Sequence, residues 1–277
     1  MSQHHKGVER VIKKEIFVPF PLLGVPIKGV YFPFVALPSR IKCIVDVKLI
    51  KSREAGRYIN RVGDELNQLS LVFLSRLFDE LNLELQPIVS IYDCSSEPPS
   101  ISLFAVITAE VFKTVSRLGH SDYRLALSLL GMLDEKVLGI DPGYMTALRC
   151  AYLFNSLCVA RGYDEFVKLG PRFVEVVEIF KMPYTSAYKA IENPYDKVVM
   201  SLIYKMATHV ISFLAQNADT WSEESYNHVR KYVALYYLVE SGIIREALKL
   251  NDIPVAHNVK HVIDINDIKS YRVVAVD

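Results

Sequence analysis

Residues 93–155 constrain the fold of this chain most, because here a polar loop leads into an almost wholly apolar helix. The loop, residues 93–100, contains two adjacent prolines and three serines but no glycine. The prolines forbid an earlier start, so Ser100 is the expected N-cap of a helix over Ile101–Leu118. That helix is apolar nearly all round through Ile107, which predicts burial on several sides.

A second helix is expected over Tyr123–Leu133, followed by a Gly-x-x-x-Gly turn over Gly139–Gly143 and a third helix over Met145–Arg161. A loop that feeds a buried helix is a place where anion sites form, because the N–H groups of the first helical turn have no partner within the helix. A backbone that wraps a phosphate usually needs several glycines, and this loop has none.

The remaining chain shows alternating strand and helix patterns. Strands are expected at residues 16–18, 30–32, 40–50, 86–92, 173–180 and 271–276. Helices are expected at residues 64–81, 195–216, 223–240, 243–250 and 255–263. Five prolines within residues 15–40 favour edge strands and turns over central ladder positions. The order predicts an α+β fold, in which a strand-rich N-terminal half packs with helices and the C-terminal half is mostly helical.

A chain of 277 residues can bury a large core. We expect a flexible tail at residues 1–14, an α+β subdomain at 15–160 and a mainly helical subdomain at 161–277. No repeat and no clean boundary separates the two subdomains. They are therefore expected to pack as one globular unit.

The 32 basic and 31 acidic side chains leave a net charge of +1. A charge this small gives no long-range electrostatic attraction to nucleic acid or to a membrane surface. A helix-turn-helix-like run at residues 244–263 keeps nucleic-acid binding open as a minor alternative. Its candidate phosphate contacts are Arg245, Lys249, Asn258, Lys260 and His261. No apolar stretch approaches the roughly 18 uncharged residues of a spanning helix. These features predict a cytoplasmic protein without a membrane segment. Scarce glutamine favours an archaeal or thermophilic source.

The four cysteines form no CxxC pair, and three of them lie in apolar runs. We therefore expect all four to be reduced and mostly buried. Glu110 and Lys113 are three residues apart on the apolar helix and are expected to be surface charges. His257 and His261 are spaced four residues apart, but without a nearby third ligand they predict no metal site.

This order of elements resembles that of the GHMP family of small-molecule kinases, which includes mevalonate, homoserine and archaeal pantoate kinases. In that family the loop before the buried helix typically reads Pro-x-x-x-Gly-Leu-x-Ser-Ser and holds the nucleotide phosphates. The corresponding candidates here are Ser95, Ser96 and Ser100, in a loop that keeps serines and prolines but lacks every glycine. The resemblance implies a GHMP-kinase-like two-layer architecture.

The family's second motif places an acidic metal ligand five residues before a turn whose Asp is the catalytic base in many members. Asp134 falls five residues before Gly139 and is the candidate metal ligand. The base position is Met145, so Asp141 is the candidate catalytic residue only if the loop is rebuilt. The family's glycine-rich loop near the C-terminus is missing, because residues 251–270 contain no glycine. ATP and Mg²⁺ are implied as cofactors only if kinase activity is retained.

Phosphoryl transfer depends mostly on positioning and on neutralising the phosphate charges, so loss of the glycine loop removes the main catalytic device. The sequence therefore predicts a divergent or inactive GHMP-kinase-like protein, a pseudoenzyme that binds a small metabolite or a protein partner. Whether it is an enzyme is left open.

The alternative function is that of a helical interaction or regulatory protein, including a homodimer, without catalytic activity. Its support is a set of candidate surface tyrosines, a residue type enriched at interfaces. They are Tyr184, Tyr188, Tyr195, Tyr232, Tyr236 and Tyr237. In the competing interpretation these rings fill the core of a large domain.

Overall fold

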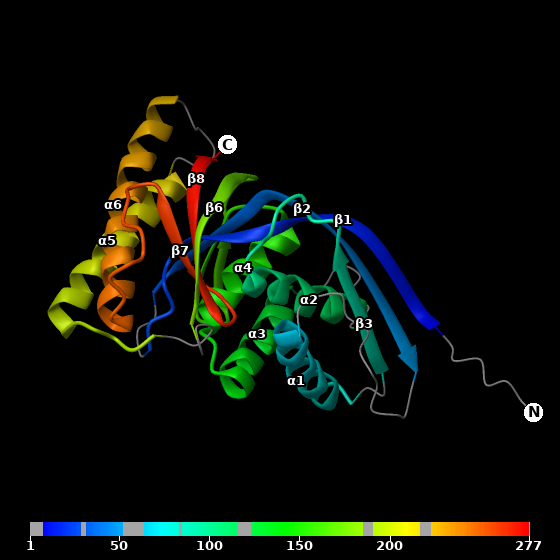
Figure 1. Ribbon diagram of the computed structural model, residues 1–277. Helices are drawn as coiled ribbons and strands as arrows, with labels where there is room; N and C mark the ends of the chain where they lie inside the picture. Colours follow the sequence, from blue (N-terminus) through cyan, green and yellow to red (C-terminus); the bar gives the residue numbers. More distant parts are fainter. Residues whose placement is uncertain are drawn as a thin grey trace, which may run out of the picture.

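The computed structural model of the chain describes residues 8–28, 32–51, 64–82, 85–115, 123–184, 191–216 and 223–276 (Figure 1). Groups of strands and helices follow one another up to β6, and two long helices then precede a final hairpin. The elements are β1 (Val8–Leu23), β2 (Phe34–Lys51), α1 (Asp64–Glu80), β3 (Leu85–Tyr92), α2 (Ser100–Val115), α3 (Tyr123–Leu133), the π-helical turn η1 (Asp134–Leu138), α4 (Pro142–Phe154), β4 (Cys158–Arg161), β5 (Glu165–Lys168), β6 (Val174–Pro183), α5 (Lys197–Gln216), α6 (Glu223–Leu248), β7 (Val259–Ile263) and β8 (Asp267–Val276).

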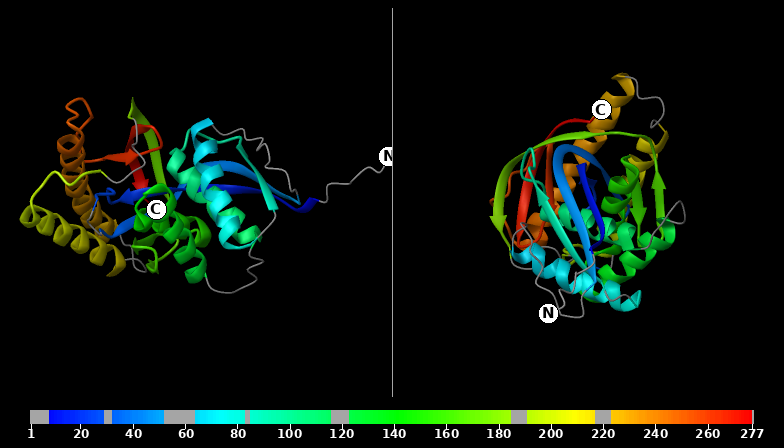
Figure 2. Two further views of the ribbon diagram at one scale, coloured as in Figure 1. Left: turned by 90° about the horizontal axis from the view of Figure 1, so that it is seen from below. Right: turned by 90° about the vertical axis from the view of Figure 1, so that its right-hand side faces the viewer.

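Strand β2 is the centre of the eight-stranded sheet formed by the described residues. It runs antiparallel to β1 along most of its length and pairs with β3 at one end and β4 at the other. A single parallel bridge from Ser39 to Val174 joins it to β6, which continues through β8 to β7. The long β1–β2 ribbon crosses the molecule above helices α1 to α4, while α5 and α6 lie at the far end (Figures 1 and 2).

Helix α2 is the most deeply buried of the helices α1 to α4. Every residue from Ile101 to Phe112 is buried, and α2 lies between β1, α1 and α4. Its Phe104 meets Phe73 of α1 edge to face, with ring centroids 5.3 Å apart. The all-round apolar pattern of α2 produces this burial, because a helix without a polar face must be covered on several sides.

The predicted α+β class is confirmed, and most expected elements are present near their expected bounds. Helices α1, α2, α3 and α5 and strands β3, β6 and β8 all occur where the patterns placed them. Strand β1 begins at Val8, inside the segment expected to be a tail. The division into subdomains at residue 160 stays a prediction. The tyrosine at position 188 lies outside the described residues.

Two expected helices are wrong in part. Residues 158–161 form strand β4 instead of continuing α4, because Asn155 takes a left-handed conformation (φ 48°) that ends the helix. Residues 259–263 form strand β7, and residues 243–248 are the last part of α6. The helix-turn-helix interpretation is therefore wrong. Two of its five proposed phosphate contacts, Lys260 and His261, are each at most 2% exposed.

The placement of prolines differs from expectation in one respect. Pro38 lies in the central strand β2, where it faces Pro19 of β1. The β1–β2 register shifts beside this pair, between Phe17 and Pro19. A proline has no backbone N–H group to donate to a neighbouring strand. A central strand therefore tolerates a proline where the regular hydrogen bonding is already interrupted.

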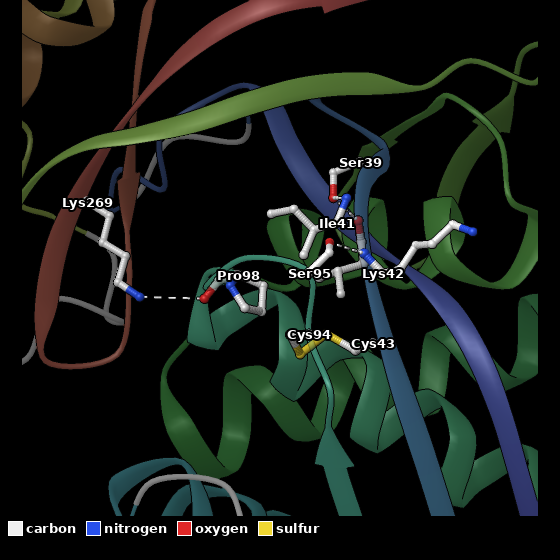
Figure 3. Close-up of a disulfide and its surroundings, with 9 residues drawn as sticks. Ser39, Ile41, Lys42, Cys43, Cys94, Ser95, Pro98 and Lys269 are labelled. Carbon is white, nitrogen blue, oxygen red and sulfur yellow. Dashed lines mark hydrogen bonds between the residues drawn. A yellow bond between two sulfur atoms is a disulfide. The ribbon is translucent and has the colours of Figure 1, made fainter.

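The prediction that all four cysteines are reduced is wrong for two of them. Cys43 of β2 and Cys94, just after β3, form a disulfide with Cα atoms 4.1 Å apart (Figure 3). The antiparallel β2–β3 ladder, with Ile44 opposite Tyr92, brings these residues together. Cys150 and Cys158 are free and buried, as predicted.

Glu110 is also not the surface charge that was expected. It is 1% exposed and accepts hydrogen bonds from Lys14 Nζ at 2.6 Å and from the Tyr152 hydroxyl at 2.7 Å. A buried carboxylate needs such partners, because an unpaired charge is costly in a low-dielectric interior. This pairing ties β1 to α2 and α4.

Candidate functional site

The serine-proline loop is held against strand β2. The backbone N–H of Ser95 donates to the carbonyl oxygen of Lys42 at 2.9 Å, and the N–H of Lys42 donates to Ser95 Oγ at 3.1 Å (Figure 3). Ser96 is exposed, and Ser100 is the first residue of α2. The three phosphate-loop candidates therefore follow one another along the loop, but only Ser100 lies at the amino end of the helix.

A carboxylate from a distant part of the chain occupies that amino end. Asp264, in the turn between β7 and β8, accepts from the N–H of Ser100 at 2.9 Å and from the N–H of Ile101 at 2.7 Å. It is fully buried and also accepts from the N–H of Ile265 at 2.9 Å. An anion at this position is favoured by the orphan N–H groups and the positive end of the helix dipole. Ser100 itself is not the cap, since Asp264 satisfies the N–H groups.

Two lysines complete the charge network around this turn. Lys269 of β8 is 1% exposed, lies 3.3 Å from Asp264 and donates to Glu97 at 2.9 Å. It also reaches the carbonyl oxygen of Pro98 at 3.5 Å, the contact drawn in Figure 3. Lys181 of β6 lies 3.3 Å from both Glu97 and Asp267.

The electrostatics of the network differ between its two ends. The ammonium group of Lys269 lowers the pKa of Glu97. Burial, reinforced by the negative charge of Asp264, raises the pKa of Asp267 to about 6. Asp267 is therefore harder to ionise than Glu97.

Asp134, the candidate metal ligand, has an arginine as its partner. The Arg149 guanidinium of α4 makes a bidentate pair with the Asp134 carboxylate, through Nη1 to Oδ2 and through Nη2 to Oδ1 at 2.9 Å. Both side chains are fully buried. Arg149 Nε also donates to Thr108 Oγ1 of α2 at 3.0 Å. Burial raises the pKa of Asp134, and the positive charge of Arg149 opposes that rise.

Asp141, the candidate catalytic residue, is the N-cap of α4. Its Oδ1 atom accepts from the N–H of Gly143 at 2.8 Å and from the N–H of Tyr144 at 3.1 Å. Gly143 cannot carry a side chain here, because a Cβ atom would lie 2.7 Å from the backbone nitrogen of Gly162. Burial raises the pKa of Asp141 to about 6, and the two backbone N–H bonds oppose the rise.

A surface cavity of about 360 Å³ opens beside this cap. Its walls are Glu135 of η1, Pro142 of α4 and the β4–β5 hairpin at residues 161–165. Arg161 within it is paired to Glu165 at 2.6 Å. The cavity is thus acidic, with one cation already neutralised.

Most of the candidate residues have partners from the chain itself: Ser95 pairs with Lys42, the Ser100 N–H with Asp264, Asp134 with Arg149, and Asp141 with the first turn of α4. Within the described residues, no group of three or more His, Cys, Asp or Glu side chains is placed to hold a metal ion. The catalytic, phosphate-binding and metal-binding roles of the candidates stay predictions. Sequence reasoning missed Asp264, Lys269 and Arg149, because each meets its partner from a different element of the fold, beyond the reach of helix or strand spacing.

Comparison with known proteins identifies the fold and nothing finer. No protein-family model and no curated protein matches the sequence. Solved structures do match it. L. major mevalonate kinase in complex with R-mevalonate superimposes with a TM-score of 0.60 and 11% identity over 99% of this chain and 90% of that one. The fold is GHMP-kinase-like.

Two further structures support this GHMP-kinase-like fold. A mevalonate diphosphate decarboxylase from Legionella pneumophila matches with a TM-score of 0.55 and 9% identity, over 95% of this chain and 93% of that one. Streptococcus pneumoniae phosphomevalonate kinase matches with a TM-score of 0.55 and 11% identity, over 95% and 91% of the two chains. At such identities the likeness concerns architecture alone. The activities of these proteins are not carried over by it.

Helix α5 has one property that the sequence analysis did not anticipate. Its 20 residues, Lys197–Gln216, are long and apolar enough to span a membrane by length and composition, and only 28% of its most apolar window is buried. It nevertheless packs against α6, where Phe213 and Tyr232 lie with ring centroids 5.7 Å apart. The cytoplasmic location stays a prediction.

Proposed function

We propose that this chain is a non-catalytic member of the GHMP-kinase-like fold that works by binding a small metabolite or a protein partner. The observation that carries the proposal is the Asp134–Arg149 pair. A guanidinium held by two hydrogen bonds and buried completely takes both oxygens of the carboxylate at the metal position.

The chemical consequence concerns the divalent cation. Phosphoryl transfer needs metal ions that bridge the phosphates and neutralise the developing charge. A carboxylate that is fully buried and bound through both oxygens by Arg149 is already neutralised and is closed to Mg²⁺ from solvent, and removing the arginine from its buried position would cost several kcal/mol. The amino end of α2, closed by Asp264, adds a second obstacle, because its N–H groups are no longer available to a phosphate.

Thermal unfolding with ATP and Mg²⁺ tests the proposal. We expect no shift of the midpoint, because a ligand stabilises only by binding the folded state. A matched assay should detect no transfer of phosphate to R-mevalonate, the ligand of the L. major structure. A Mg²⁺-dependent shift that is lost in D134N but kept in D79N, an exposed carboxylate of α1, would overturn the proposal.

A second candidate function, binding a protein through the C-terminal helices, is favoured by exposed apolar side chains. On α5, Val198 and Leu202 are 70% and 61% exposed, and on α6 Leu235 is 55% exposed. Exposed apolar groups of this size are typical of interaction surfaces when they are contiguous. Tyr236 and Tyr237 do not contribute, because both fill the core. Tyr232, at 44% exposed, is available.

Light scattering tests the homodimer form of this alternative. A dimer that becomes a monomer in L202E would support it, whereas a monomer over the whole measured concentration range would exclude it. The matched control is K205E, an exposed charge change on the same helix.

A further inference from the structure

Helix α5 has a buried face and an exposed face of different character. The buried face carries five apolar side chains that recur every three or four residues, namely Met200, Ile203, Ala207, Val210 and Leu214. The opposite stripe carries exposed side chains at spacings of four, three and four residues, namely Val198, Leu202, Lys205 and His209. Val198 and Leu202 are 70% and 61% exposed. The exposed stripe thus combines large aliphatic side chains with a lysine and a histidine.

The charged side chains of α5 are all basic. Its 20 residues contain no aspartate or glutamate, although the whole chain has nearly as many acidic as basic side chains. Lys197 and Lys205 are both exposed. Asp196, just before the helix, accepts hydrogen bonds from the N–H groups of Val198 and Val199 at 2.8 and 2.9 Å. The carboxylate next to α5 in sequence is therefore engaged by the amino end of the helix, and the exposed stripe carries positive charge.

The part of the neighbouring α6 that follows residue 231 has a similar composition. Leu235 and Leu238 are 55% and 39% exposed. This part has two carboxylates, Glu240, which pairs with the buried Lys260, and the exposed Glu246 two residues before the end of the helix. Both helices therefore expose apolar side chains that few acidic groups accompany.

The fold determines how α5 can meet another surface. Tyr204 accepts a hydrogen bond from Arg161 Nη1 at 3.3 Å, and its ring centroid lies 6.0 Å from that of Phe32. Spanning a bilayer would remove these contacts and the five buried side chains from the fold, so α5 can offer only its exposed stripe. The helix is about 30 Å long and lies at the end of the molecule opposite to β3, where an extended flat surface can reach it (Figures 1 and 2).

The chemistry of the stripe favours a lipid surface over a second copy of the chain. A two-fold contact pairs the same patch of both protomers, so it would bury the lysines of the stripe without a carboxylate partner. An anionic bilayer suits both kinds of side chain, because its acyl chains accept aliphatic groups and its headgroups attract lysines.

We propose that α5 docks this protein on the surface of an anionic bilayer. Val198 and Leu202 insert at the boundary between headgroups and acyl chains, and Lys197 and Lys205 lie at the lipid phosphates. This docking goes beyond the proposed function and uses neither Asp134 nor its partner, so the failure of one leaves the other standing.

Sedimentation of the full chain with lipid vesicles tests the docking. The chain should bind vesicles of phosphatidylcholine and phosphatidylserine at about 3 to 1 but not vesicles of phosphatidylcholine alone, and added salt should weaken the binding. L202N should weaken it about tenfold, because an inserted side chain is lost. K205Q should weaken it about fivefold, the contribution of one lysine at the surface. The matched controls L125N and K136Q, at an exposed leucine of α3 and an exposed lysine of η1, should leave binding unchanged.

Absence of binding, or equal binding to the neutral and the anionic vesicles, would overturn the proposal. Equal losses in L202N and L125N, or in K205Q and K136Q, would assign the adsorption to another face and overturn it as well. A dimer that L202N dissociates and K205Q leaves intact, without vesicle binding, would assign the stripe to a second copy of the chain. Circular dichroism checks that each variant is folded, and V198N replaces L202N if that variant does not fold.

Discussion

Two buried carboxylates of this molecule are neutralised in opposite ways. Asp134 is paired with Arg149, 15 residues further along the chain, through η1 and α4. Asp264 is paired with the amino end of α2, 163 and 164 residues earlier, through a turn that reaches across the sheet. The partners of the first pair are close in sequence. The second pair forms only when the β7–β8 hairpin packs against the amino end of α2.

The comparison shows that a buried carboxylate can be compensated in two ways. A buried carboxylate must meet a positive charge or several N–H donors. A guanidinium supplies both from one side chain. Asp264 instead meets the orphan N–H groups of the helix amino end together with the buried ammonium group of Lys269, 3.3 Å away. The Asp264 contact therefore satisfies both partners at once, and it ties the hairpin to the most buried helix of the fold.

The largest expected effect comes from breaking the Asp134–Arg149 pair. R149M leaves a fully buried carboxylate without its cation and should lower the free energy of unfolding by about 3 to 5 kcal/mol. Urea denaturation measures the loss. D134N/R149M should recover part of it, since the uncompensated charge is then gone. K136M, which removes an exposed cation of η1, should change stability by less than about 1 kcal/mol.

Removing the long-range carboxylate should have the next largest effect. D264A deletes the acceptor of the Ser100, Ile101 and Ile265 N–H groups and should cost about 3 kcal/mol. Hydrogen exchange should accelerate at Ser100 and Ile101. The exposed D252A is the matched control. Unchanged exchange at the start of α2 in D264A would show that another group caps the helix.

The smallest expected effect is a pH dependence from the local cap, Asp141. Its pKa is raised from 3.8 to about 6 in the folded state, so the folded chain binds more protons than the unfolded chain between about pH 4 and about pH 6. Stability should therefore fall as the pH rises through this window, by about 1 kcal/mol for a partly exposed side chain.

D141N tests this pH dependence, because the amide keeps a cap acceptor but does not titrate. Urea denaturation across the window should give a smaller slope for D141N than for the natural chain. Asp267, whose pKa is also raised to about 6, should keep part of the slope in D141N, and D267N should remove that part. Identical slopes in all three proteins would contradict the assignment.

Periodic patterns predicted the parts of the fold that depend on neighbours in sequence. The amphipathic repeat of α1 and the apolar run of α2 placed both helices, and the α+β class followed from their order. The patterns failed at β4 and β7, whose short apolar runs fit either a helix or a strand. They also missed the Cys43–Cys94 disulfide, which depends on the β2–β3 register.

The candidate site, like the fold, was predicted only where the relevant residues are close in sequence. Sequence alone determined that a glycine-free loop precedes a buried helix, and that Asp134 precedes a turn that contains Asp141. Only the tertiary structure decided that Arg149 takes the first carboxylate and that Asp264 closes the helix. The reason is physical. Helix and strand preferences act between neighbours in sequence, whereas the partner of a buried charge is whichever group the folded chain brings to within hydrogen-bond distance.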